Sequence, residues 1–320
     1  MAIAIAAGSW ISDSYTNAAG TRTFQLYVPA GHAKAEKRPL LVHIHGCTET
    51  PGEFAGLTRI AQLADKQRLL VLLPGQSATA NPSLCWNWFV PENQKRGAGE
   101  PSIIKGMIDR VESRYSVDRD RVYVAGVSSG GYMTSILLSC YADVFAAGMV
   151  ASGGMYEAAL DLNTAIPAAL QGSARDPKVS GADAYRCSGS VHPRLVPVLV
   201  FHGGEDPYVN VRGSQQVADA FVQMNDLGDD GEDNDSIVSL ANGSDTAPGG
   251  LAYTWNDYGL GSTTLIRHYV VTHMGHAWSG GDANYPYTEP RGPDETALMW
   301  SFFEKWRRDA LTRGKQRSVR

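Results

Sequence analysis

A serine with glycines two residues away on either side is the first candidate for chemistry in this sequence. Residues 126–130 (GVSSG) fit the pattern G-x-S-x-G. An apolar run at 122–125 precedes the pattern and a helix-like segment follows it, which is typical of a serine held at a sharp strand-to-helix turn. Small flanking residues allow the strand and the helix to pack closely at such a turn. The pattern predicts Ser128 as a nucleophile, and Ser129 is the alternative.

A serine hydroxyl is a weak nucleophile, so it needs a histidine as general base and a carboxylate that orients this histidine. In proteins that hold a nucleophilic serine at such a strand-to-helix turn, these residues follow in the order serine, acid, histidine. The apolar run at 196–201 leads to Glu205 and Asp206. We predict Asp206 as the acid because Pro207 fixes the chain directly after it, and Glu205 is the close competitor.

Two histidines compete for the role of general base. His273 and His276 both follow the apolar run at 265–271. Gly275 precedes His276 and indicates a loop position that is free to turn toward Ser128. We therefore predict His276 as the base.

The negative oxygen of a tetrahedral intermediate needs two backbone N–H groups. One is expected from Ser129, at the positive N-terminus of the helix that follows the nucleophile. The other is expected from Cys47, in the loop after the first buried apolar run. His43 and His45 form an H-x-H pair, but no acid or histidine at metalloenzyme spacing accompanies them, so we predict no metal and no cofactor.

The elements that position these residues are visible as alternating patterns. A first strand with one solvated face is expected at 23–28. Continuous apolar runs predict buried strands at 40–44, 69–73, 122–127, 145–151, 196–201 and 265–271. Helix-like spacing fills 54–66, 103–111, 132–140, 217–224 and 294–308, with a polar turn at 118–120. Strands that alternate with helices predict an α/β fold with a mostly parallel sheet covered by helices on both faces.

Length and composition limit the function classes. The chain has 320 residues, a hydrophobic fraction of 43% and a net charge of −5, and the last two values exclude a disordered chain, a collagen, a coiled coil and a strongly basic nucleic-acid binder. No apolar run approaches the roughly 18 residues of a membrane span, so we expect neither nucleic acid nor membrane as a partner. We predict a single catalytic domain over 1–320, with insertions at about 152–195 and 225–250.

Three polar or terminal segments carry weaker signals. Five acidic residues at 229–235 lie among glycines and asparagine without the ordered spacing of a calcium loop, which predicts a solvated acidic loop. Residues 1–7 lack a basic region and are too short for a secretion signal. The basic residues at 307–320 predict a solvated, frayed end.

Four motifs in this order resemble those of polyhydroxybutyrate depolymerase family esterases, which overlap the feruloyl and acetylxylan esterases of the carbohydrate esterase family 1 class. They are 45–49 (HGCTE), 85–89 (CWNWF), 126–131 (GVSSGG) and 275–281 (GHAWSGG). The resemblance extends over about residues 21–306. It implies an α/β-hydrolase fold, a catalytic triad of Ser128, Asp206 and His276, and a disulfide between Cys47 and Cys85. The chain departs from the family with Glu49 where glutamine is usual, with Ser129 where alanine is common, and with the acidic insertion.

The cysteine count allows either disulfides or free thiols. The four cysteines are even in number and too widely spaced for C-x-x-C motifs. Besides the pair that the resemblance implies, we predict a disulfide between Cys140 and Cys187. Disulfides favour an extracellular or periplasmic location, and a cytoplasmic one with buried thiols stays open.

The sequence thus predicts a serine esterase. The expected partner is a carboxylic ester substrate, either a short-chain ester, a hydroxycinnamoyl ester or a polyester such as polyhydroxyalkanoate. The expected intermediate is an acyl-enzyme. Aromatic side chains offer flat apolar surface for such substrates, and Trp278, Trp86 and Trp88 are the candidates, with packing in the core as the alternative. The rival functions are an acyltransferase on the same residues, a peptidase and a binding protein without catalysis. The oligomeric state does not follow from the sequence.

Overall fold

The computed structural model describes residues 8–32, 36–189 and 194–311. The predictions for residues 1–7 and for the basic tail from residue 312 onward lie outside the described residues. Within these described ranges, no helix is long and apolar enough to cross a membrane.

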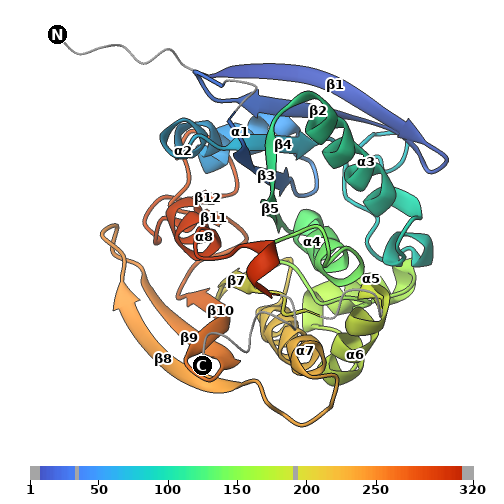
Figure 1. Cartoon of the computed structure of the whole chain (residues 1–320). Helices are drawn as coiled ribbons and strands as arrows, with labels where there is room; N and C mark the ends of the chain where they lie inside the picture. Colours follow the sequence, from blue (N-terminus) through green and yellow to red (C-terminus); the bar gives the residue numbers. More distant parts are fainter. Residues whose placement is uncertain (1–7, 33–35, 190–193, 312–320) are drawn as a thin grey trace.

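The described residues form a sheet of ten strands in the order β1-β2-β4-β3-β5-β6-β7-β10-β9-β8 (Figure 1). Neighbours from β4 through β10 in this order pair in parallel, and β1, β2, β9 and β8 extend the two edges in antiparallel fashion. The strands are β1 (Ser9–Asn17), β2 (Gly20–Val28), β3 (Arg38–Ile44), β4 (Leu70–Pro74), β5 (Val117–Val127), β6 (Ala147–Ala151), β7 (Val198–Gly203), β8 (Val238–Thr246), β9 (Ala252–Leu260) and β10 (Thr263–Val271).

Helices cover both faces of the sheet (Figure 1). They are α1 (Pro51–Thr58), α2 (Ile60–Gln67), α3 (Gly99–Arg114), α4 (Ser129–Cys140), α5 (Leu162–Gln171), α6 (Pro177–Ser188), α7 (Arg212–Asp229) and α8 (Glu295–Phe303). Side chains alternate between the faces, so that Leu40 and Val42 belong to the hydrophobic cluster that includes residues of α3, α4 and α7, whereas Leu41 belongs to the one that includes residues of α1, α2 and α8. Short elements complete the chain: 3₁₀ turns η1 (Pro91–Gln94) and η2 (Arg308–Leu311), and a small ladder of β11 (Trp278–Ser279) and β12 (Thr288–Glu289).

The structure confirms the predicted α/β fold, with differences at particular elements. The outer strands β1, β8 and β9 were not predicted, because none has a continuous apolar run: β1 and β8 are largely exposed, and β9 is mostly half-buried. The helix expected at 54–66 is two helices, since Arg59 adopts a left-handed conformation with φ of 53° between them. The turn expected at 118–120 belongs to β5, and the closing helix ends at Phe303 rather than at residue 308.

The two segments expected as insertions hold regular structure. Residues 152–195 contain α5 and α6, and residues 225–250 contain the end of α7 and the strand β8. The acidic region is only partly a solvated loop, because α7 continues to Asp229. Asp226 is buried, and its carboxylate accepts the backbone N–H groups of Asn234 and Ser236. These two hydrogen bonds tie the loop back onto α7.

Candidate active site

Ser128 lies at the turn between β5 and α4, in a conformation that side chains rarely adopt. Its φ is 57° and its ψ is −124°. The turn is so tight that a Cβ on Gly126 would overlap the carbonyl group of Gly130, and a Cβ on Gly130 would overlap the carbonyl oxygen of Ile44. Glycine is therefore required at both positions, which is the steric reason that we inferred for the motif.

Ser129 has a structural hydrogen bond for its side chain. The residue is 3% exposed, and its hydroxyl accepts the backbone N–H of Trp86 at 3.2 Å. As the first residue of α4 it also has a backbone N–H without a partner inside the helix. The side chain thus supports the neighbouring loop, and the amide is the part that remains for a substrate oxygen. This arrangement favours Ser128 over Ser129 as the nucleophile.

Asp206 and His276 form a buried pair at the ends of β7 and β10. His276 Nδ1 lies 2.7 Å from Asp206 Oδ2, and the two side chains are 11% and 0% exposed. The other carboxylate oxygen of Asp206 accepts the backbone N–H groups of Tyr208 and Val209. With Nδ1–H donating to the aspartate, Nε2 of His276 keeps a free lone pair, which is the form that a general base needs.

The pKa of Asp206 lies below its usual value of 3.8. Burial raises this pKa, but the hydrogen bond and the charge of His276, together with the Val209 N–H, lower it by a larger amount. Asp206 is therefore a carboxylate at neutral pH, and it can orient His276 and stabilise the imidazolium that forms during proton transfer.

The competing pair is on the surface. His273 Nδ1 lies 2.6 Å from Glu205 Oε1, but these side chains are 72% and 63% exposed, and neither residue lines the pocket beside Ser128. Two histidine–carboxylate pairs thus come from the same two loops, and only the pair of Asp206 and His276 is buried at the pocket.

The loop that carries Cys47 is held from several sides. His45 Nε2 accepts the backbone N–H of Gln76, and its Nδ1 donates to the carbonyl oxygen of Gly46. The backbone N–H of Thr48 donates to the carbonyl oxygen of Ser83 at 2.7 Å. These contacts fix the loop next to the N-terminus of α4, as an oxyanion hole would require.

His43 and His45 are neutral residues of the interior. Burial lowers the pKa of His43 to about 3 and that of His45 to about 4. His43 stacks on Phe54 with ring centroids 4.3 Å apart. Within the described part of the chain, no group of three or more histidine, cysteine, aspartate or glutamate residues is arranged to hold a metal ion.

Both predicted disulfides are confirmed. Cys47 is bonded to Cys85, and Cys140 to Cys187. The first bond joins the loop after β3 to the loop that carries Trp86, and the second joins the end of α4 to α6. The N–H of Trp86 in turn reaches the hydroxyl of Ser129, so the first disulfide connects two loops that both border the nucleophile.

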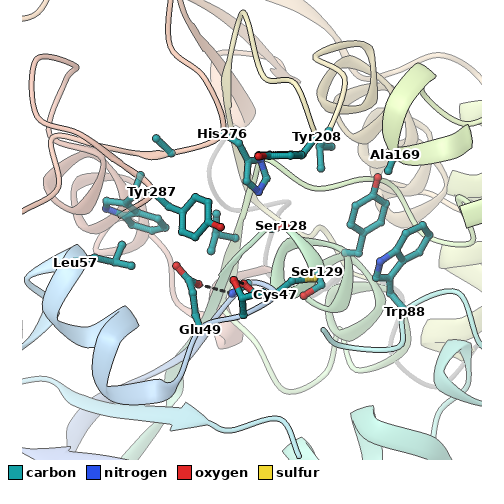
Figure 2. Close-up of a pocket in the computed structure, with 17 residues that line it drawn as sticks. Cys47, Glu49, Leu57, Trp88, Ser128, Ser129, Ala169, Tyr208, His276 and Tyr287 are labelled. Atoms are coloured by element: carbon teal, nitrogen blue, oxygen red, sulfur yellow. Dashed lines mark hydrogen bonds between the residues drawn. The ribbon is translucent and has the colours of Figure 1, made fainter. Parts of the chain in front are cut away.

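A pocket of about 380 Å³ brings most of the candidate residues together (Figure 2). Ser128, Ser129, Cys47 and His276 line it, and Trp88 and Trp278 contribute to its walls. Trp88 stacks on Tyr132 with ring centroids 3.8 Å apart. The volume suits a small acyl group or one segment of a longer ester.

The position of Trp86 contradicts the prediction that it binds substrate. It is 0% exposed and does not line the pocket. Its backbone lies against Ser129, and its ring is 5.7 Å from that of His45. The motif places two tryptophans two residues apart, and the intervening turn directs one into the core and the other into the pocket.

Sequence reasoning missed two tyrosines. Tyr208 and Tyr287 line the pocket, and their rings lie edge-on to His276 at centroid distances of 5.5 and 6.5 Å (Figure 2). Tyr208 follows the predicted acid by two residues, which is a signal that could have identified it. Tyr287 comes from the segment before β12, where no pattern in the sequence indicates proximity to the site.

The sheet order, the serine at the turn between β5 and α4 and the buried histidine–aspartate pair beside it define the class of protein as an α/β-hydrolase. An acetyl xylan esterase from Aspergillus awamori has this fold, with a TM-score of 0.68 at 20% identity over 83% of this chain and 94% of that one. Within this class, the chain belongs to the esterase PHB depolymerase family, whose model matches residues 22–235. The resemblance drawn from the four motifs is thereby confirmed.

Individual relatives carry different names. The chain is 28% identical to poly(3-hydroxyalkanoate) depolymerase C of Paucimonas lemoignei over 266 residues, which is 83% of this chain and 60% of the relative. It is 38% identical to feruloyl esterase B of Neurospora crassa over 128 residues, which is 40% of this chain and 42% of the relative. The matched parts thus span 60% or less of the length of these two relatives.

Proposed function

We propose that this protein is a serine esterase that hydrolyses carboxylic esters through an acyl-enzyme on Ser128. The observation that carries the proposal is the buried pair of Asp206 and His276 at 2.7 Å, with His276 lining the same pocket as Ser128. Membership in a family of esterases and depolymerases supports it.

The reaction follows from the roles of these groups. His276 Nε2 takes the hydroxyl proton as Ser128 Oγ attacks the ester carbonyl carbon, and the amides of Cys47 and Ser129 stabilise the negative oxygen. The bond to the alcohol breaks, and the alcohol leaves with the proton from His276. Water then gives a proton to His276 as it attacks the acyl-enzyme, and His276 returns this proton to Ser128 Oγ as the bond to the acid breaks.

Labelling with a fluorophosphonate tests the nucleophile directly. We expect a covalent adduct of one phosphonate per chain, located by peptide mass spectrometry on Ser128, because only an activated serine displaces fluoride from this reagent. The control is the Ser128→Ala variant, which should stay unlabelled. An unlabelled wild-type protein would favour the binding-protein alternative. Esterification of an added alcohol in preference to hydrolysis would favour the acyltransferase.

We propose further that the substrate is an uncharged, apolar ester such as an aliphatic polyester. Three exposed side chains of α5, Leu162, Ile166 and Leu170, are spaced by four residues and form one stripe, named here the α5 stripe. Ala169 of the same helix lines the pocket, and its carbonyl oxygen accepts the N–H of Asn210 in the loop that carries Tyr208. The apolar surface therefore continues from the pocket onto α5, which has no charged residue.

Replacing the three residues of the α5 stripe with serine should reduce hydrolysis of a polyhydroxyalkanoate film about tenfold, which corresponds to about 1.4 kcal/mol of lost contact. Hydrolysis of soluble p-nitrophenyl butyrate should be unchanged, because the stripe lies outside the pocket. As a control, Ile11→Ser with Val238→Ser removes exposed apolar side chains from β1 and β8 at the sheet edges and should leave both rates unchanged. An unchanged rate on the film for the α5 variant would contradict the polyester proposal.

The two disulfides support an extracellular or periplasmic location, where such bonds persist. We propose this location for the protein.

A further inference from the structure

The pocket contains one carboxyl group that the proposed reaction does not use. Glu49 is 7% exposed and lines the pocket. Its Oε2 accepts the backbone N–H of Gly46 at 2.7 Å, which directs the carboxyl group toward the loop that carries Cys47 (Figure 2). Glu49 therefore combines a structural hydrogen bond with a position on the pocket wall.

The carboxyl group of Glu49 lies beside the nucleophile. A Cβ built on Gly46 would lie 3.1 Å from Ser128 Cβ and 3.2 Å from Glu49 Oε2, so both side chains approach the space beside Gly46 Cα. Both residues line the same pocket, so an ester bound at Ser128 shares this pocket with the carboxyl group.

The charged groups that face Glu49 within the described part of the chain include no lysine or arginine. His276 faces it from the loop after β10 and Glu53 from α1, and the other titratable groups on the wall are Tyr132, Tyr208 and Tyr287. Among the described residues that line the pocket, none is a lysine or an arginine. An anion brought into this pocket would therefore meet a negative group without compensation.

The charge of Glu49 changes near neutral pH. Burial raises its pKa to about 7, against the opposing effects of the Gly46 N–H and of His276. The carboxyl group is thus neutral in acid and ionised in mild alkali, in contrast to an exposed glutamate, which is ionised throughout this range.

We propose that Glu49 is a specificity-determining residue that selects against esters carrying a negative charge near the scissile bond. The inference rests on the proposed esterase function. Like charges repel, so an ionised Glu49 disfavours an anionic acyl chain, whereas its effect on the tetrahedral oxyanion is common to neutral and anionic esters and cancels when the two are compared. The discrimination strengthens as the pH rises, because a larger fraction of Glu49 is then ionised.

The test compares two soluble probes, p-nitrophenyl butyrate as the neutral ester and the mono-p-nitrophenyl ester of glutaric acid as the anionic ester. The free carboxyl of the second probe is ionised throughout the range from pH 6 to pH 8.5. For the wild type, the ratio of kcat/KM for the neutral over the anionic ester should rise about tenfold across this range. In Glu49→Gln the ratio should be lower and independent of pH, since glutamine keeps an oxygen for the Gly46 N–H without the charge.

Glu53→Gln is the matched control. Glu53 belongs to the first turn of α1, where its carboxylate accepts the hydroxyl and backbone N–H of Thr50, and it does not line the pocket. This variant loses the same charge four residues away and should keep a ratio that rises with pH, shifted to slightly lower pH because the charge of Glu53 raises the pKa of Glu49. A wild-type ratio that does not change with pH, or a Glu49→Gln variant that keeps the wild-type dependence, would overturn the inference while the esterase function stands. If the wild type hydrolyses neither ester, both the proposed function and this inference are wrong.

A thermal measurement provides a readout that does not depend on activity. Because the pKa of Glu49 is higher in the folded chain than its usual value of 4.5, folding favours the protonated form. The resulting stabilisation is complete below pH 4.5 and is lost as the pH rises through about 7. The Tm of Glu49→Gln minus that of the wild type should therefore increase over this interval and then stay level. A constant difference would show that Glu49 ionises as an exposed group does and would overturn the inference.

Discussion

Replacing Ser128 with alanine should reduce kcat for p-nitrophenyl butyrate by about a millionfold, because the acyl-enzyme can no longer form. The turn between β5 and α4 holds this residue in place through the tight contacts of Gly126 and Gly130, so the loss of one hydroxyl leaves the backbone unaffected. The circular dichroism spectrum and the Tm should match those of the wild type. The residual rate would come from the backbone amides of the oxyanion hole and from binding alone.

The control for this variant is Ser129→Ala. It removes the hydroxyl that accepts the N–H of Trp86 but keeps the backbone amide at the start of α4. We expect it to retain at least about a tenth of the activity and to lower the stability by about 1 kcal/mol, the usual contribution of one hydrogen bond. Activity that survives in Ser128→Ala and disappears in Ser129→Ala would reverse the assignment of the nucleophile.

Replacing Asp206 with asparagine should reduce kcat by about 10⁴. Asparagine would present either an amide N–H or an oxygen to His276 Nδ1, and it lacks the charge that stabilises an imidazolium. When the N–H faces Nδ1, the histidine proton moves to Nε2, and the ring can no longer take the proton of Ser128. The loss should appear in kcat at pH 7 to 8, with little change in KM, because Asp206 does not line the pocket.

The exposed pair provides the matched control. Glu205→Gln alters a histidine–carboxylate contact of 2.6 Å in the adjacent position of the same loop. Since this contact is on the surface, we expect kcat to change less than about twofold. A large loss in Glu205→Gln and a small one in Asp206→Asn would identify His273 and Glu205 as the working pair.

The central sheet was predictable because strands covered on both faces are continuous apolar runs, as in β3 and β7. The edge strands β1 and β8 were not, because their side chains are mostly exposed, so that no apolar alternation marks the hairpins that they form with β2 and β9. The break at Arg59 was also hidden, since an apolar pattern continues across it while the backbone turns.

The candidate site was predictable where each residue follows the end of a buried strand, as Ser128, Asp206 and His276 do. The residues that form the pocket walls were less predictable. Trp86 and Trp88 are equivalent in the sequence, yet the hydrogen bond from the Trp86 backbone to Ser129 turns the Trp86 ring into the core. Tyr287 approaches His276 through the small ladder of β11 and β12, a two-residue pairing that no periodicity reveals.

The position of β10 has a consequence for the order of folding. In the sequence, α7, β8 and β9 lie between β7 and β10, and the contact of Asp206 with His276 joins residues 70 positions apart. The pairing of Ile44 in β3 with Gly126 in β5, which brings the Cys47 loop to the turn at Ser128, is also between distant parts of the chain. Non-local pairing of this kind is slow to form. Ester hydrolysis during refolding should therefore report the completion of both strand pairings rather than the formation of a single helix or hairpin.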